Sequence, residues 1–520
     1  MSSDYFEDAK HARDKLNEIS PTMCMAKWLQ VSMHLPQGLT QSCYHPPTHK
    51  IPLSELEVTP KALHNTVEKV KQRKEMWEGK RPSGCQYCWN IEDAPDGPHL
   101  SDRHYRSSEW WVGDGWQEVV DGGRDENINP RYVEVNFNQA CNFKCVYCSP
   151  HLSTEWEKEI QEYGPFKLSE KFYHNNIPSL EASGLMPIHS SAKDNPYVAA
   201  FWKWWPDLYK DLKVFRMTGG EPLMDKNTFK VLDYVNKHPN SSLDLSITSN
   251  MCPPDQRLFT RFIDKLKAIE TVRIWEDTEK FNPDSGNNWY VAPACKHFSL
   301  YISVDGTGEQ AEYMRTGLNF NKMLDNTRTF LQETHGTEIS FINTFNLLSI
   351  PSLKNFLQMI LDLRVEFGYE KQSDYVEIPP DNDGFKHPPF KRGRRQRVWF
   401  DIPYLRMPDW MSAQNAAFYP ELIDILEDCV KFMEDNVEDE YYGRTYHGFK
   451  KYEIAKVKRN LAWIKSGTNE ISNEEITRRR VFSCRYFNQI YHRRKTDFAK
   501  TFPELNKWWN DCYKAQQREL

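Results

Sequence analysis

The sequence lacks any apolar run near twenty residues, which is the length that a membrane-crossing helix needs. Its first residues, Met-Ser-Ser-Asp-Tyr-Phe-Glu-Asp, are polar and acidic, and no secretory signal can be read in them. A surplus of basic charge is also missing, because 67 Lys and Arg face 73 Asp and Glu, for a net charge of -6. Such a balance gives no overall attraction to nucleic acid. These absences predict a cytoplasmic protein with no membrane partner.

Disulfide bonds are not expected either, although the chain contains 12 cysteines. Disulfides are rare in the reducing cytosol, so free thiols or metal ligands are the expected forms. Five cysteines stand at wide, irregular spacings and are expected to be thiols of the core. They are Cys252, Cys295, Cys429, Cys484 and Cys512. The other seven form two groups whose spacing predicts metal chemistry.

The first group consists of Cys141, Cys145 and Cys148, with the spacing C-x3-C-x2-C. Residues 131–138 alternate apolar and polar side chains, which predicts a strand that ends at the cysteine loop. Three thiolates can hold an iron-sulfur cluster and leave one iron open to a small molecule. A structural zinc site is the alternative, although a fourth ligand at matching spacing is missing nearby.

A second motif follows about seventy residues later. The predicted strand 213–218 runs into Gly219, Gly220, Glu221 and a proline, and a helix is predicted over 226–237. Adjacent glycines permit a positive φ and a close approach of the backbone to a ligand, while Glu221 offers a carboxylate to an amino group. An ordinary turn between strand and helix is the alternative.

Together, the cysteine triple and the Gly-Gly-Glu-Pro turn resemble the radical S-adenosylmethionine (radical SAM) superfamily. The resemblance extends over roughly residues 125–405 and continues in the predicted strands 243–250, 300–306 and 338–346. It implies an α/β fold built on a partial (β/α)6 TIM-like barrel. It also implies a site-differentiated [4Fe-4S] cluster on the three cysteines, whose open iron binds S-adenosylmethionine.

The resemblance further assigns residues to the cofactor. Tyr147 matches the position beside adenine, and Gly219 to Glu221 match the residues that hold the methionine amino group. Five polar residues match positions near the ribose or the carboxylate: Ser249, Asn250, Ser303, Asp305 and Asn343. For Ser303, Asp305, Asn343 and Asn346, ordinary roles at strand ends and in loops stay open.

The second cysteine group precedes the first and consists of Cys24, Cys43, Cys85 and Cys88. Four thiolates saturate a cluster. The segment resembles the auxiliary-cluster module called SPASM or, in its shorter form, twitch, but here it stands before the barrel. The resemblance implies one auxiliary [4Fe-4S] cluster. A zinc site with the same four ligands stays open.

The sequence predicts three domains: an auxiliary-cluster module at 1–122, the radical SAM barrel at 123–410 and a helical region at 411–520. Helices are expected at 256–269 and 321–334 in the barrel, and at 419–436, 446–466, 473–479 and 503–518 beyond it. The sixth barrel strand is either 374–379 or, as we prefer, 398–407. The insertions 150–210 and 275–297 are rich in Trp, Tyr and Pro, and are expected to be specificity loops.

Three basic runs, 391–397, 478–480 and 492–495, lie near or within the helical region. With the aromatic residues between them they are expected either to bind an anionic substrate or RNA, or to form a solvated face that balances acidic neighbours. The balanced face is favoured.

The resemblance implies reductive cleavage of S-adenosylmethionine and abstraction of hydrogen from a substrate. SPASM and twitch relatives often modify peptides, so a peptide or protein substrate is the first hypothesis. The alternative is a small molecule, nucleotide or tRNA, and a further alternative is a non-catalytic iron-sulfur or zinc scaffold. A low-potential donor such as flavodoxin or ferredoxin is the expected redox partner.

Overall fold

The computed structural model shows a mixed α/β protein with a parallel sheet and many helices. It describes residues 3–95, 97, 99–124, 126–168, 175–188, 195–270, 272–275, 289–367, 396–438 and 447–519. The chain forms two compact units. Unit 1 comprises Met1–Cys141, Ile177–Thr248 and Thr271–His297, and unit 2 comprises Asn142–Asn176, Ser249–Glu270 and Phe298–Leu520.

Four strands of unit 1 are parallel neighbours, in the order β1, β4, β6 and β7. Two short strands, β2 and β3, extend the sheet beyond β1 by antiparallel pairing. The bounds are β1 (Gln30–His34), β2 (Leu39–Gln41), β3 (His49–Lys50), β4 (Tyr132–Asn136), β6 (Val214–Thr218) and β7 (Asn240–Ser249). A separate antiparallel pair joins β8 (Val272–Trp275) to β9 (Trp289–Ala292).

The two faces of the parallel strands differ sharply in chemistry, because successive side chains point to opposite faces. One face is apolar and buried, and consists of Val31, Met33, Val133, Val135, Phe215, Met217, Leu245 and Ile247. The other face is mostly polar, and the strand register places Ser32, Glu134, Arg216 and Ser246 in one row across it.

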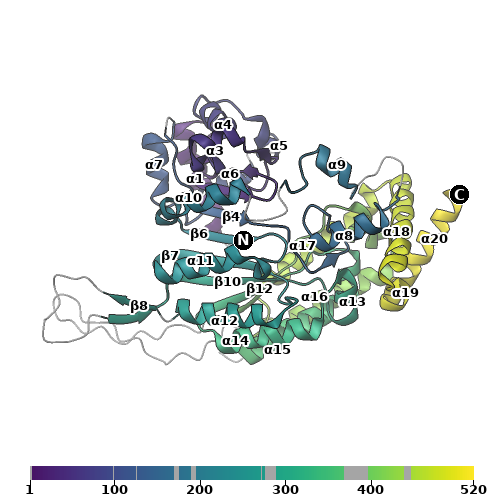
Figure 1. Ribbon diagram of the computed structural model, residues 1–520. Helices are drawn as coiled ribbons and strands as arrows, with labels where there is room; N and C mark the ends of the chain where they lie inside the picture. Colours follow the sequence, from purple (N-terminus) through teal and green to yellow (C-terminus); the bar gives the residue numbers. More distant parts are fainter. Residues whose placement is uncertain are drawn as a thin grey trace. The chain divides into compact units, whose positions relative to one another are not determined.

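Helices of unit 1 supply the rest of its core. In Figure 1, α1 and α3 to α7 gather in one cluster, drawn in purple and blue. The core there is built on tryptophans such as Trp28, Trp89 and Trp111. The bounds are α1 (Ser3–Ile19), α2 (Ala26–Leu29), α3 (Leu53–Val58), α4 (Val67–Trp77), α5 (Gln86–Glu92), α6 (Asp102–Ser107), α7 (Gly115–Gly122), α9 (Ile177–Ala182), α10 (Pro196–Asp211) and α11 (Lys226–Lys237).

Unit 2 contains three parallel strands in the order β10, β12 and β13, and a short antiparallel pair, β5 with β11. The bounds are β5 (Lys144–Cys145), β10 (Cys295–Ser303), β11 (Arg315–Thr316), β12 (Thr337–Ile342) and β13 (Val398–Asp401). The residues of β10 that pair with β12 begin at Phe298. The β5–β11 pair matters for the site, because β5 contains a cysteine of the triple.

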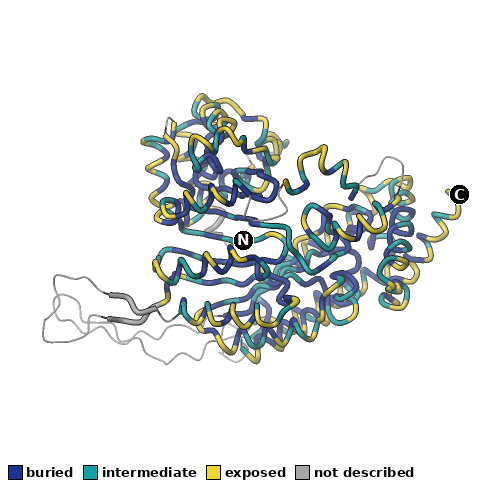
Figure 2. Tube along the Cα trace, in the orientation of Figure 1, coloured by how far each residue is buried: buried dark blue, intermediate teal, exposed yellow. Residues whose placement is uncertain are grey.

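Unit 2 is otherwise helical. Several of its helices bury one side and expose the other, so dark blue and yellow alternate along their tubes in Figure 2. The bounds are α8 (Thr154–Tyr163), α12 (Gln256–Glu270), α13 (Gly308–Met314), α14 (Phe320–Glu333), α15 (Leu353–Phe367), α16 (Pro420–Asp435), α17 (Lys451–Glu470), α18 (Asn473–Arg494), α19 (Phe498–Thr501) and α20 (Asn506–Glu519).

Most predicted elements are confirmed, and the helix expected over 226–237 has those bounds. The strand expected over 398–407 is shorter, since β13 ends at Asp401, just before Pro403, which has no N–H for a ladder. The helix expected over 473–479 instead continues to Arg494 as α18, because Phe482, Tyr486 and Ile490 give it a buried stripe.

Some expectations fall where the structure gives no description. The strand candidate 374–379, most of the insertion 275–297, parts of the insertion 150–210 and most of the basic run 391–397 lie outside the described residues. Within the described residues, no helix combines the length and the apolar character that a membrane span needs.

Candidate active site and cysteine pocket

The Gly-Gly-Glu turn lies in unit 1, directly against the residues that lead into Cys141. The amide of Glu221 donates to the carbonyl of Ala140 at 2.7 Å. A methyl group on Gly220 would stand 2.3 Å from that same carbonyl oxygen, and Gly219 has a φ of +126°. Both positions therefore require glycine, one for space and one for conformation. Within unit 1, the turn therefore contacts the residue directly before Cys141.

Side chains of unit 1 fix this contact. Asn138 accepts from the Ala140 amide at 2.7 Å and donates to Asp225, the N-cap of α11. Burial raises the pKa of Asp225, and its hydrogen bonds to Asn227 counteract this effect. Glu221 is itself buried, and its carboxylate accepts from the amide of Leu223 at 3.0 Å.

Cys145 and Cys148 belong to unit 2, where a buried ion pair stands beside Cys145. Cys145 on β5 pairs with Arg315 on β11, and the guanidinium Nη1 lies 3.6 Å from the Cys145 sulfur. Arg315 Nε is 2.8 Å from the Asp305 carboxylate, and Arg315 also donates to the Tyr147 hydroxyl at 2.6 Å. The Tyr147 hydroxyl in turn donates to Asp305 at 2.7 Å. The structure thus brings together the predicted residues Cys145, Tyr147 and Asp305.

This group shifts the ionisation of its members. Burial raises the pKa of the Cys145 thiol, and the nearby charge of Arg315 opposes that rise. Burial tends to lower the pKa of Arg315, yet Asp305, Tyr147 and Cys145 together outweigh this effect, and the pKa lies above the usual range. Arg315 therefore keeps its charge next to a cysteine sulfur, where it favours the thiolate, the form that binds iron.

Four backbone carbonyls of the cysteine loop, residues 143–146, are each held by a side chain. Ser153 donates to the carbonyl of residue 143 at 2.7 Å, and Trp156 to that of Cys145 at 2.8 Å. Arg494 donates to the carbonyl of residue 144 at 2.7 Å, and Tyr486 donates to that of residue 146. Trp156 stands on α8, while Tyr486 and Arg494 stand on α18. Two helices thus hold the loop in one conformation.

The other predicted cofactor residues of unit 2 lie at strand ends. Asn250 donates to Asn142, next to the cysteine loop, at 2.9 Å. Ser249 accepts from the amide of Met251 at 3.0 Å, and Ser303 ends β10. Asn343 follows β12 and is fully buried, yet its side-chain oxygen and nitrogen find no partner among the described residues. Their roles toward the cofactor stay predictions.

Three residues of this region escaped the sequence analysis. Arg315 follows Asp305 by ten residues and belongs to no recognisable motif. Tyr486 and Arg494 were considered only as parts of a basic, aromatic segment. The side chain of Arg494 is fully buried and pairs with Glu159 of α8 at 3.0 Å. It supports the cysteine loop, and it is not exposed to an outside anion.

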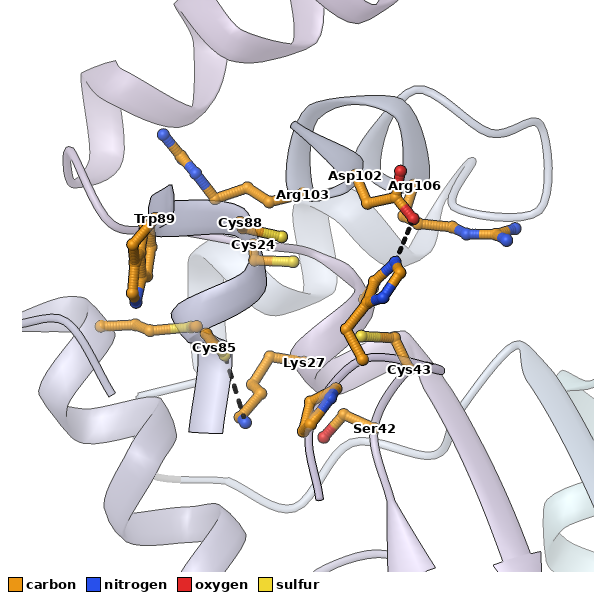
Figure 3. Close-up of a pocket in the computed structure, with 14 residues that line it drawn as sticks. Cys24, Lys27, Ser42, Cys43, Cys85, Cys88, Trp89, Asp102, Arg103 and Arg106 are labelled. Carbon is orange, nitrogen blue, oxygen red and sulfur yellow. Dashed lines mark hydrogen bonds and ion pairs between the residues drawn. The ribbon is translucent and has the colours of Figure 1, made fainter. Parts of the chain in front are cut away.

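The four upstream cysteines line one pocket of unit 1 (Figure 3). The empty space at the pocket, counted together with the solvent that opens into it, is about 440 Å3. The sulfurs of Cys24 and Cys88 point toward the same space from two different segments. Within the described part of the chain, no three His, Cys, Asp or Glu side chains stand close enough together to hold one metal ion.

The thiols of the pocket influence one another. Burial raises the pKa of Cys24 above its usual range, and the charges of Cys43, Cys88 and Cys85 raise it further. Burial likewise raises the pKa of Cys88 to about 12. Such thiols lose their protons when a metal binds, because metal ligation requires the thiolate. By donor type alone, four sulfurs suit either an iron-sulfur cluster or zinc, the two predicted occupants.

The polar face of the unit 1 sheet is a further candidate site. Glu134 and Arg216 stand side by side on it, with Arg216 Nε 3.7 Å from a Glu134 oxygen. Tyr44 donates to Glu134 at 3.1 Å. Burial raises the pKa of Glu134, and the charge of Arg216 opposes this effect. Among the described residues, buried polar atoms of Gln30 and Ser32 on the same face lack any partner.

An α/β fold in which a Gly-Gly-Glu turn contacts the residue before Cys141 is the arrangement expected of a radical SAM enzyme. No family model matches the chain. The chain is 22% identical over 267 residues to the GTP 3',8-cyclase of Nautilia profundicola. The aligned residues cover 49% of this chain and 68% of that protein.

Two further relatives bear the same name. The chain is 26% identical over 160 residues to the GTP 3',8-cyclase of Desulforamulus reducens, covering 31% of this chain and 37% of the relative. It is 26% identical over 119 residues to that of Campylobacter lari, covering 23% of this chain and 27% of the relative. GTP 3',8-cyclases are radical SAM enzymes that use a [4Fe-4S] cluster and S-adenosylmethionine, and these similarities support the resemblance of the chain to that superfamily.

Proposed function

We propose that the chain is a radical SAM enzyme that acts on a small polar molecule, with a nucleotide as the favoured class. The observation that carries this proposal is that three GTP 3',8-cyclases, whose name denotes a nucleotide substrate, resemble the chain. The matches with the second and third relatives span well under two thirds of those proteins. A peptide or protein substrate, which was the first hypothesis from the sequence, fits these relatives less well.

Cys141, Cys145 and Cys148 would hold the [4Fe-4S] cluster, and Gly219, Gly220 and Glu221 would bind the methionine end of S-adenosylmethionine. When bound, this pair supplies a 5'-deoxyadenosyl radical that removes a hydrogen atom from the substrate. The partial (β/α)6 barrel and the twitch-like nature of residues 1–122 belong to the same proposal. Flavodoxin or ferredoxin as electron donor, and the cytoplasm as location, stay predictions.

The protein's own residues would prepare the site before any substrate arrives. Arg315 would favour the thiolate of Cys145 and orient Tyr147 through its hydrogen bond. The carbonyl contacts from α8 and α18 would fix the cysteine loop, so that little reorganisation is needed during the reaction. Glycine at 220 would let the turn lie against the backbone of Ala140, directly before Cys141.

The polar face of unit 1 supports a small polar substrate. Arg216 is suited to a phosphate or carboxylate, because its guanidinium offers several donors to two oxygens. Glu134 is suited to an N–H group of a base. The unpartnered atoms of Gln30 and Ser32 need hydrogen bonds that a polar ligand would provide. A hydrophobic peptide segment would leave these groups unsatisfied.

The test is 5'-deoxyadenosine formation by the anaerobically reconstituted, reduced protein, with and without GTP. We expect the product to form, and we expect Cys145→Ala to abolish it. Cys429→Ala is the matched control, because Cys429 is a buried cysteine of α16 and should leave formation unchanged. Equal product from the wild type and Cys145→Ala would overturn the proposal.

Substrate class is tested by binding to the same holoprotein. We expect Arg216→Gln to weaken GTP binding at least tenfold, because a charge-assisted pair to phosphate is lost. Arg257→Gln, at an exposed position of α12, is the control. If a peptide library stimulates 5'-deoxyadenosine formation and nucleotides do not, the peptide hypothesis replaces the nucleotide.

A further inference from the structure

Three cations of unit 1 are buried without a carboxylate to neutralise them, and one of them, Lys27, lines the four-cysteine pocket. Lys27, Lys69 and Arg73 are 3%, 1% and 2% exposed. Throughout the described part of unit 1, no Asp or Glu forms an ion pair with any of them. We call these three residues the cation triad. A buried charge is costly unless an opposite charge or strong hydrogen bonds compensate it.

The partners that the triad does have are neutral groups and a thiol. Lys69 donates to Thr40 at 3.0 Å and lies 3.4 Å from a His64 nitrogen. Arg73 donates to Asn65 at 2.6 Å and to the backbone carbonyl of Lys27 at 3.1 Å. The Lys27 ammonium contacts Gln72 and lies 3.7 Å from the Cys85 sulfur, the contact marked by a dashed line in Figure 3.

The cations also act on one another. Burial lowers the pKa of Lys69 well below its usual range, and the charges of Arg73 and Lys27 lower it further. Burial lowers the pKa of Arg73 to about 9. The Cys43 thiolate acts in the opposite direction and favours the charged form of Lys69. Without such a negative charge, burial and the neighbouring cations favour the neutral form of Lys69.

Two other cations that line the pocket do have carboxylate partners. Arg103 is paired with Glu92 at 2.9 Å, and Arg106 lies 3.7 Å from Glu109. Their charge is already compensated inside unit 1. The uncompensated positive charge thus lies on the side of the pocket where Lys27 meets Cys85. Four cysteine thiolates around an iron-sulfur cluster carry a net negative charge, and reduction by one electron adds another.

We propose that Lys27, Lys69 and Arg73 compensate the charge of an iron-sulfur cluster held by Cys24, Cys43, Cys85 and Cys88, and that they raise its reduction potential. The inference rests on the proposed function, because it treats the cluster as a redox partner of that enzyme. Positive charge stabilises the reduced, more negative state, so the cluster is suited to accept an electron. Hydrogen bonds to cluster sulfurs act in the same direction. The triad consists of positioning residues, and none of them is a ligand.

The experiment is a redox titration of the anaerobic holoprotein, followed by electron paramagnetic resonance of the reduced cluster. One electron passes from the reductant, dithionite, to the cluster, and no other bond changes. We expect Lys69→Met to raise the ratio of oxidised to reduced cluster roughly tenfold at a fixed potential, which is 59 mV for a one-electron couple. Lys69→Arg should keep the wild-type potential, because it keeps the charge.

Lys71→Met is the matched control, since Lys71 is exposed on the same helix, α4. We expect it to leave the potential unchanged. If Lys69→Met does not fold, Lys27→Gln tests the same point at Cys85 and should shift the potential in the same direction. An unchanged potential in a neutralised variant with full iron content overturns the proposal.

Metal analysis separates this inference from the proposed function. We expect about eight irons per chain, and about four in Cys24→Ser. Zinc in the wild type that is lost in Cys24→Ser overturns the inference, while 5'-deoxyadenosine formation would still support the function. A second cluster with the predicted shift, in a protein that makes no 5'-deoxyadenosine, overturns the function alone.

Discussion

At the scale of single residues, Arg315 joins three groups of the candidate site in unit 2. It is 8% exposed and its partner Asp305 is fully buried. The same guanidinium contacts Tyr147 and the sulfur of Cys145. Both oxygens of Asp305 are engaged, because the amide of Thr344 also donates to it at 2.8 Å. Asp305 thus organises the cysteine loop, and its predicted role toward the ribose stays a prediction.

Removing the guanidinium should therefore cost stability. We expect Arg315→Met to lower the free energy of unfolding by about 3–5 kcal/mol, because it leaves Asp305 as an unpaired buried charge. Arg328→Met is the control: Arg328 and Glu366 form an exposed pair, whose loss should cost at most about 1 kcal/mol. Chemical denaturation of both variants under anaerobic conditions measures the difference. Equal decreases in the free energy of unfolding for the two variants would show that the buried pair stabilises the fold no more than the exposed pair.

His104 gives a pH dependence that can be tested. Burial lowers its pKa to about 4, and the charge of Arg103 adds to this effect. Its Nδ1 accepts from the Ser101 amide at 3.0 Å, which requires an unprotonated nitrogen. The neutral ring is favoured in the folded state, so the stabilisation is present above about pH 6.5 and is lost as the pH falls toward 4.

We expect the free energy of unfolding to fall by up to about 1.4 kcal/mol per pH unit below pH 6.5 through this residue. His104→Gln should remove that part of the slope, whereas His11→Gln, at an exposed position of α1, should not. Thermal midpoints between pH 7 and pH 5 provide the measurement. A slope that is the same in the wild type and His104→Gln would contradict the assignment.

At the scale of elements, α18 supports the cysteine loop from a distant part of the sequence. Tyr486 and Arg494 contact carbonyls of the loop, and the helix packs through its buried aromatic side. We expect Tyr486→Phe to keep the fold and to slow 5'-deoxyadenosine formation by roughly 5–10-fold, the factor that about 1–1.4 kcal/mol represents.

Tyr491→Phe is the matched control for that variant, because Tyr491 is 49% exposed on the same helix. Iron content should be measured alongside the rate, so that loss of cluster is distinguished from a misplaced cluster. Wild-type rates in Tyr486→Phe would show that the hydroxyl contact does not matter to the loop.

The elements themselves were largely predictable, whereas these contacts were not. Strands such as β4 and helices such as α11 follow from local periodicity and turn residues, which the sequence displays directly. The contacts of Arg315, Tyr486 and Arg494 with the loop span 170, 340 and 350 residues. No spacing rule connects residues so far apart, because tertiary packing alone brings them together. The cysteines and glycines were found because their chemistry needs a fixed local spacing.

At the scale of the whole molecule, charge is distributed as internal pairs. The chain carries a net charge of -6 despite its basic runs. Arg478 and Arg479 pair with Glu475 at 2.6 and 2.8 Å, and Arg480 lies 3.9 Å from Asp511. This arrangement supports the balanced face that the sequence analysis favoured over RNA binding.

We therefore expect the holoprotein to bind RNA no more tightly than roughly 10⁻⁴ M at physiological salt, the weak end of non-specific binding. A salt titration with a single-stranded oligonucleotide measures this, and Lys507→Gln, at an exposed position of α20, serves as the control. A steep salt dependence that disappears on replacing Arg478 to Arg480 by Gln would contradict the expectation and favour RNA.

The support of the loop by α18 has a consequence for biosynthesis. The ribosome makes the chain from its N-terminus, so the cysteines emerge 340 residues before Tyr486. At about 5–20 residues per second, this delay lasts roughly 17–70 seconds. During that interval the cysteines lie in a segment that Tyr486 and Arg494 cannot yet contact, because these residues have not been synthesised. The loop would be most accessible to iron and sulfide during that interval. After the ribosome has made Arg494, α18 could cover the loop and this access would end.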